Sequence, residues 1–119
     1  MLNLDTHILI DALQGALSKR ERQLLSGDSW SISAIVLWEI AKLNQLRRIS
    51  IDLESPEFNR ALSRIRIWPL DLAVCLQSTK LDFKSDPADE LIAATSLIHN
   101  VPLLTRDRRT LKSKTVPFA

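Results

Sequence analysis

The sequence predicts an α/β fold, a three-layer sandwich in which helices flank a mostly parallel central sheet of four or five strands. Two observations predict it. Short β-like runs are separated by helical stretches of ten or more residues, which is the length that a parallel crossover requires. The 119 residues are 45% hydrophobic and 25% charged, which is enough for one compact core. We therefore expect a single domain over residues 1–119.

The first half of the chain alternates between strand and helix patterns. Residues 1–4 form a short strand, and apolar residues then recur at helical spacing over 6–17. Charged residues 19–22 are expected to be solvated beyond that helix. Residues 30–33 form the second strand. Ser33 then opens a helix that runs to about Leu46, because a serine suits the N-cap position.

The second half continues the alternation. A basic helical stretch follows Pro56. After it we expect a strand at 66–70, helices at 71–81 and 87–100, a strand at 102–105 and an optional edge strand at 115–118. The predicted order is therefore β-α-β-α-α-β-α-α-β, with one more strand in the five-strand version.

Composition excludes some classes of protein. Cys75 is the only cysteine, so there is no disulfide within the chain and no cysteine-rich metal site, and we expect it to be a small buried side chain. The net charge of +2 neither demands nor excludes a nucleic-acid partner. No apolar run approaches the roughly 20 residues that span a bilayer. We expect a cytoplasmic protein with no membrane partner.

Four acids fall near junctions between predicted strands and helices. Asp5 directly follows the first strand, and Asp107 follows the last one with only Arg106 between. Asp89 lies in the first turn of its helix, and Glu39 lies within about 10 Å of the start of its helix, at 1.5 Å per residue. Ligands of parallel α/β sheets bind at the carboxyl ends of the strands. All four acids are therefore expected at one edge of the sheet.

Glu39 is the most informative of the four. It lies in the apolar run IVLWEIA, which leaves no obvious solvated stripe for an ordinary surface acid. Burying a lone carboxylate is costly unless it is paired or binds a cation, and Lys42 is its only local basic partner.

Each of the other acids also has an architectural explanation. Asp5 suits a helix N-cap, Asp107 suits a turn, and Asp86 before Pro87 is explained by capping alone. The joint placement of Asp5, Glu39, Asp89 and Asp107 favours chemistry, because hard divalent cations such as Mg²⁺ and Mn²⁺ prefer oxygen ligands.

Four stretches carry a resemblance to a known family: MLNLDTHILIDAL, SISAIVLWEIAKL, SDPADELIAAT and VPLLTRD. In this order and spacing they resemble the acidic motifs of PIN-domain ribonucleases, specifically the VapC-like toxins of type II toxin–antitoxin pairs. The resemblance spans essentially the whole chain. It implies a PIN-like fold and an endoribonuclease that hydrolyses RNA phosphodiester bonds with Mg²⁺ or Mn²⁺.

The resemblance also implies the site and the partners. Asp5, Glu39, Asp89 and Asp107 match the family's catalytic and metal-binding acids, around one or two ions. The implied partners are an RNA substrate, a cognate antitoxin protein and a second copy of the chain in a homodimer. One departure is Glu90, where relatives with the same opening often carry arginine. This acid changes how a substrate phosphate or an antitoxin acid is met at the rim.

Side chains around these motifs have less specific roles. Basic residues follow the last motif and are expected to bind phosphate, although a solvated helix end explains them equally well: Arg106, Arg108, Arg109, Lys112 and Lys114. The hydroxyls of Thr6 and Thr105 could orient carboxylates or cap backbone. The three tryptophans lie in apolar runs and are expected in the core, and His7 is expected to be structural.

Two alternatives remain open. A PIN fold without activity would act only as a binding protein, although the presence of all four acids argues against it. A receiver-like signalling domain is the other alternative. It should have paired acids after the first strand and a lysine after the last, whereas here Thr6 and His7 follow Asp5 and no lysine directly follows residues 102–105.

Overall fold

A computed structural model describes residues 1–119, and its centre is a sheet of four strands. They are β1 (Leu2–Leu4), β2 (Trp30–Ser33), β3 (Arg66–Trp68) and β4 (Leu103–Leu104). The strands are all parallel and lie in the order β3-β2-β1-β4. The three-layer α/β prediction is confirmed in its four-strand version.

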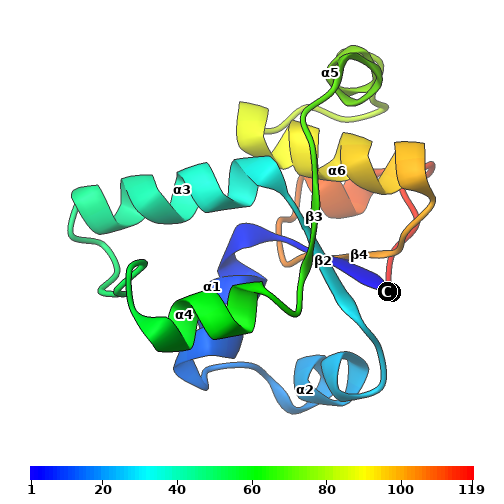
Figure 1. The fold of residues 1–119 in the computed structure, drawn as a ribbon. Coiled ribbons are helices and arrows are strands. Elements are labelled where there is room, and N and C mark those ends of the chain that lie inside the picture. The colour runs from blue at the N-terminus through cyan, green and yellow to red at the C-terminus, as the bar shows by residue number, and fades with distance from the viewer.

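Six helices flank this sheet. They are α1 (Thr6–Gln14), α2 (Lys19–Ser26), α3 (Ala34–Gln45), α4 (Pro56–Leu62), α5 (Leu72–Ser78) and α6 (Pro87–His99), followed by the 3-10 helix η1 (Thr110–Lys112). In the view of Figure 1, α5 and α6 lie above the strands, whereas α2 and α4 lie below them. No helix is both long enough and apolar enough to span a membrane.

Helix α2 is not among the predicted helices. Of the charged residues 19–22, Lys19, Arg20 and Arg22 are exposed as expected, and Glu21 is buried. Ser18 accepts a hydrogen bond from the backbone of Glu21, whose side chain in turn accepts one from the backbone of Ser18. This reciprocal capping box satisfies two backbone donors at the start of the helix. Glu21 is only 7% exposed. The sequence does contain the signal, since serine followed three residues later by glutamate is a helix-start signature.

The optional fifth strand at 115–118 is reduced to a single bridge. Leu103 pairs in parallel with Phe118, and its backbone N–H donates to Pro117 O at 2.8 Å. The backbone N–H of Ala119 donates to Leu103 O at 3.0 Å. The C-terminal segment therefore covers the free edge of β4 without forming a regular strand.

The core lies between the sheet and the helices that follow each strand. Leu4 and Ile32 from the strands are fully buried, as are Val36 and Ile40, which lie four residues apart on one face of α3. Ile92 of α6, a helix that packs against α3 and β2, belongs to the same buried cluster. This packing holds α3 and α6 against the sheet, so the first turns of both helices stay close to the carboxyl ends of the strands.

Two predictions about the core are wrong. Cys75 is exposed on α5, not buried. Trp38 is 56% exposed, although Trp68 is buried as expected. Helix α3 turns Trp38 outward because Val36 and Ile40 already occupy its inner face.

Candidate functional site

The register of β1 and β4 determines where Asp5 lies. Leu4 pairs with Leu104, so Asp5 and Thr105 follow at the same level of the sheet edge. The Thr105 hydroxyl donates a 2.5 Å hydrogen bond to Asp5 Oδ2. Asp5 also caps α1, because its Oδ1 accepts from the backbone N–H of Thr6 at 2.7 Å. Asp5 therefore caps α1 and also lies at the candidate site.

Glu39 reaches the same edge from α3. Its Oε1 accepts a 2.5 Å hydrogen bond from the hydroxyl of Thr6. Glu39 is half-buried, and its partner is this threonine and not Lys42, which donates to Gln45 instead. Both threonine hydroxyls thus orient carboxylates, which was one of the two roles considered for them.

Asp89 and Asp107 are joined by Ser85. The Ser85 hydroxyl lies 2.9 Å from Asp89 Oδ2 and 2.9 Å from Asp107 Oδ2. Asp107 Oδ2 also accepts from the backbone N–H and the hydroxyl of Thr110, so Asp107 holds the start of η1 as well. Sequence reasoning gave Ser85 no role. The only available signal was a hydroxyl four residues before Asp89, and that signal is weak.

The four predicted acids meet in one pocket. Its volume is about 420 Å³, and Ile8 is its only hydrophobic lining residue. The nine lining residues are Asp5, Thr6, His7, Ile8, Glu39, Asp86, Asp89, Arg106 and Asp107. His7 was expected to be structural, but it is exposed and lines this pocket. Sequence reasoning placed all four acids correctly but did not place His7 and Asp86 in the pocket.

Burial and mutual repulsion raise the pKa of three of these acids. Desolvation raises the pKa of Asp89 to about 6, and the negative charges of Asp5 and Asp107 add to it. Desolvation likewise raises the pKa of Glu39 and of Asp5, against the lowering effect of the threonine hydrogen bonds. Gathering these carboxylates in the pocket therefore disfavours their charged forms when no cation is bound.

Asp107 differs from the other three. Burial raises its pKa, but hydrogen bonds from Thr110 and Ser85 together outweigh that effect and leave the pKa below its usual value. Among Asp5, Glu39, Asp89 and Asp107, only Asp107 has a lowered pKa, which favours its ionised form. Its hydrogen bonds hold this carboxylate in place after the end of β4.

None of the four acids forms an ion pair within the protein. Arg106 lines the pocket, but its guanidinium pairs with Glu21 and Asp11. Arg106, one of the basic residues expected to bind phosphate, therefore has its charge paired within the protein. Arg108 and Arg109, by contrast, are exposed beyond the pocket.

Asp86 does not cap α6 as expected. It occupies the N-cap position, but its side chain makes no capping hydrogen bond. The side chain is 82% exposed and lies 3.9 Å from Arg109 Nη1.

The donor set of the pocket fits a hard divalent cation. All candidate ligands are oxygens, and three of them accept no hydrogen bond from the protein: Glu39 Oε2, Asp89 Oδ1 and Asp107 Oδ1. No three acidic, histidine or cysteine side chains lie close enough together to hold one ion directly. That spacing suits Mg²⁺, which keeps several waters and uses one or two carboxylates.

Comparison with known proteins identifies the family. Residues 3–115 match the sequence profile of the PIN domain family, which is almost the whole chain. No curated protein is similar enough in sequence to count as a relative.

Solved structures share the fold. A toxin–antitoxin complex from Klebsiella pneumoniae contains a chain that is similar with a TM-score of 0.76 and 22% identity, over 100% of this chain and 97% of that one. FitAcB from Neisseria gonorrhoeae gives 0.69 and 21%, over 100% and 97%. VapBC2 from Rickettsia felis, bound to a DNA fragment from its promoter, gives 0.69 and 20%, over 100% and 98%. Identities this low establish the fold alone.

Proposed function

The chain belongs to the PIN domain family, and on that premise we propose that it is a metal-dependent endoribonuclease and the toxin of a toxin–antitoxin pair. One observation carries the proposal. Four carboxylates from β1, α3, α6 and the end of β4 line a single pocket, and none of them has a cationic partner in the protein. Family membership leaves no support for the receiver-domain alternative.

The residues of the pocket would hold Mg²⁺ or Mn²⁺. Asp5, Glu39, Asp89 and Asp107 are the proposed ligands, directly or through water. When bound, such an ion makes water a better nucleophile near neutral pH and neutralises phosphate charge.

The threonine and serine hydroxyls around these acids supply orientation. Thr105 fixes Asp5, Thr6 fixes Glu39, and Ser85 fixes Asp89 and Asp107. In each of the last three acids one oxygen is held while the other stays open to the pocket. This division suits ligands that must be in place before the ion arrives.

RNA would lie along the basic surface beside the pocket. Arg108, Arg109, Lys112 and Lys114 are exposed in and around η1, directly after Asp107. Such cations bind backbone phosphates without reading sequence. The scissile phosphate would then lie over the acids, with its charge met by the bound cation and not by Arg106.

The proposed protein partner is an antitoxin. The similar chains come from structures described as toxin–antitoxin complexes or as VapBC and FitAB assemblies. We propose that an amphipathic antitoxin segment ending in a basic residue enters the acidic pocket, where ion pairing and helix-in-groove binding supply affinity. A homodimer is also expected, and light scattering of the purified chain measures it.

RNA cleavage by the purified chain, freed of any partner, tests the nuclease. Cleavage should require Mg²⁺ or Mn²⁺ and stop with excess chelator. Equal cleavage in chelator rules out the metal mechanism, and no cleavage of any RNA with either ion favours the silent binding protein. Co-expression with the neighbouring gene, followed by copurification and the same assay, tests the antitoxin. A complex as active as the free chain contradicts inhibition by pocket occupancy.

A further inference from the structure

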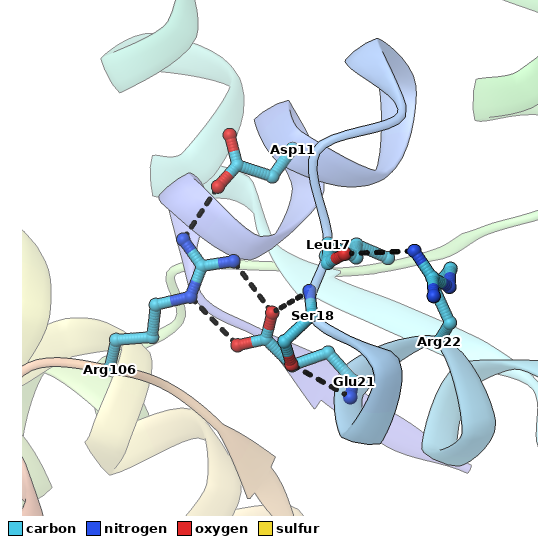
Figure 2. A network of polar contacts seen from close by, with 6 residues as sticks. All are labelled: Asp11, Leu17, Ser18, Glu21, Arg22 and Arg106. Atoms are coloured by element: carbon cyan, nitrogen blue, oxygen red, sulfur yellow. Dashed lines mark hydrogen bonds and ion pairs between the residues drawn. The ribbon is translucent and has the colours of Figure 1, made fainter.

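Arg106 is the only arginine or lysine that lines the acidic pocket, but its guanidinium pairs with acids other than the four pocket carboxylates. Its Nε donates to Glu21 Oε2 and its Nη2 to Glu21 Oε1, each at 2.7 Å. Its Nη1 donates to Asp11 Oδ2 at 2.5 Å. Figure 2 shows the guanidinium between these two acids, which come from α1 and α2.

The geometry is that of a strong restraint. Two parallel N–H···O bonds to one carboxylate form the bidentate pairing that gives arginine its specificity. Glu21 is itself buried and held by the backbone N–H of Ser18 at 2.9 Å. Hydrogen bonds from Arg106 lower the pKa of Glu21 to about 2, so the pair is fully charged at neutral pH.

The position of Arg106 makes the restraint consequential. It lies between Thr105, which holds Asp5, and Asp107, which is a pocket acid. Its side chain is 42% exposed, so part of its surface is open to solvent. A guanidinium released at this place would be attracted by the unpaired pocket carboxylates, whose mutual repulsion it would relieve.

We propose that Glu21 and Asp11 hold the Arg106 guanidinium away from the four pocket carboxylates, and that this restraint keeps those carboxylates available to a divalent cation. Glu21 is thus a positioning residue that acts through Arg106. The inference rests on the proposed function, because it concerns the cation that the nuclease would use. A purely structural pair would instead only fasten the segment after β4 to α2.

Mn²⁺ binding to the purified full chain, measured by isothermal titration calorimetry without RNA, tests the inference. The variants are Glu21→Gln, Arg106→Gln and the double variant. Glutamine preserves the capping box at α2, so Glu21→Gln removes mainly the ion pair. Glu57→Gln is the matched control, because Glu57 is an exposed acid of α4 outside the pocket and its loss changes the net charge equally.

Glu21→Gln should weaken Mn²⁺ binding by about tenfold, the effect of one added neighbouring charge in a partly screened site. Glu57→Gln should stay within about twofold of wild type, as screening predicts for a distant exposed charge. Arg106→Gln and the double variant should bind Mn²⁺ as tightly as wild type or more tightly. If Glu21→Gln does not fold, Asp11→Asn replaces it in the same comparison and should weaken binding in the same direction.

Three results overturn the inference. Wild-type affinity in Glu21→Gln means that the pair does not protect the site. Weakened binding in Arg106→Gln and in the double variant means that the pair only fastens the loop. A wild-type chain that binds no Mn²⁺ overturns the proposed metal site as well, so failure of the function is distinguished from failure of the restraint.

Discussion

The hydroxyl of Thr105 donates a 2.5 Å hydrogen bond to Asp5, a residue one hundred positions earlier in the chain. The contact exists because β1 and β4 are neighbouring parallel strands in register at Leu4 and Leu104. Both residues are buried, so the bond operates where solvent competes little. The fold therefore orients Asp5 before any ligand binds.

Replacing Thr105 by valine should remove this orientation. The variant keeps the shape of the side chain but leaves a buried carboxylate oxygen without its donor, at a cost of about 1.5 kcal/mol in unfolding free energy. RNA cleavage with Mn²⁺ should fall by about tenfold or more, because a misplaced ligand weakens the metal site. Thr105→Ser restores the donor and should recover most of the activity. Equal rates in the valine and serine variants contradict a role for the hydroxyl.

Asp89 and Asp86 should respond differently to the same substitution. Asp89→Asn deletes a proposed metal ligand and should abolish cleavage, while the circular dichroism spectrum stays that of the folded chain. Asp86→Asn should retain most of the activity. Its side chain makes no capping bond, so the stability change should stay below about 0.5 kcal/mol. Loss of activity in Asp86→Asn together with an active Asp89→Asn means that the roles of the two acids are reversed.

Ser85→Ala should remove the hydroxyl that bridges Asp89 and Asp107. The Ser85 hydroxyl is within 2.9 Å of both carboxylates, so its loss exposes them to each other's charge without a shared hydrogen-bonding partner. We expect weaker Mn²⁺ binding by calorimetry, by about threefold to tenfold, as is typical for a residue that supports metal ligands. Ser85→Thr retains the hydroxyl and is the control. An unchanged Mn²⁺ affinity in Ser85→Ala removes the bridge from the account of the site.

Much of the fold and site was readable from local patterns. The alternation of short strands with helical periods predicts the layers, and Asp5, directly after Leu4, and Asp107, three residues after Leu104, lie at the carboxyl ends of the strands. Glu39 stood out because its surroundings in sequence are apolar. These signals are local, and the rule that parallel strands end at one edge converts them into proximity.

The errors arose from contacts between distant segments. Arg106 seemed available for phosphate because its partners, Asp11 and Glu21, lie 95 and 85 residues earlier. Trp38 was expected in the core because hydropathy alone does not say which face of an apolar helix packs inward. Ser85 carried no signal, since its role depends on where Asp107 returns to the site.

The stability of the metal-free chain should depend on Asp89. Its pKa in the folded chain is about 6, against an ordinary value of 3.8, so between these pH values the folded chain binds more protons than the unfolded chain. Stability attributable to Asp89 therefore falls as pH rises from about 4 to 6 and stays low above that window. Asp89→Asn lacks this loss. In chelator at pH 7 it should be more stable by about 1 kcal/mol, a value discounted for the partial exposure of Asp89.

Added Mg²⁺ should make the wild type more stable than Asp89→Asn. A ligand at a hundredfold excess over its Kd stabilises the folded state by about 2.7 kcal/mol, and Asp89→Asn should gain much less. Thermal unfolding of both proteins at pH 4, 5, 6 and 7, with chelator and with Mg²⁺, measures each step. If Asp89 were only a helix-start acid, Asp89→Asn would lose favourable interaction with the helix dipole and be less stable in chelator. That outcome, with wild-type melting indifferent to millimolar Mg²⁺, contradicts the metal-binding assignment of Asp89.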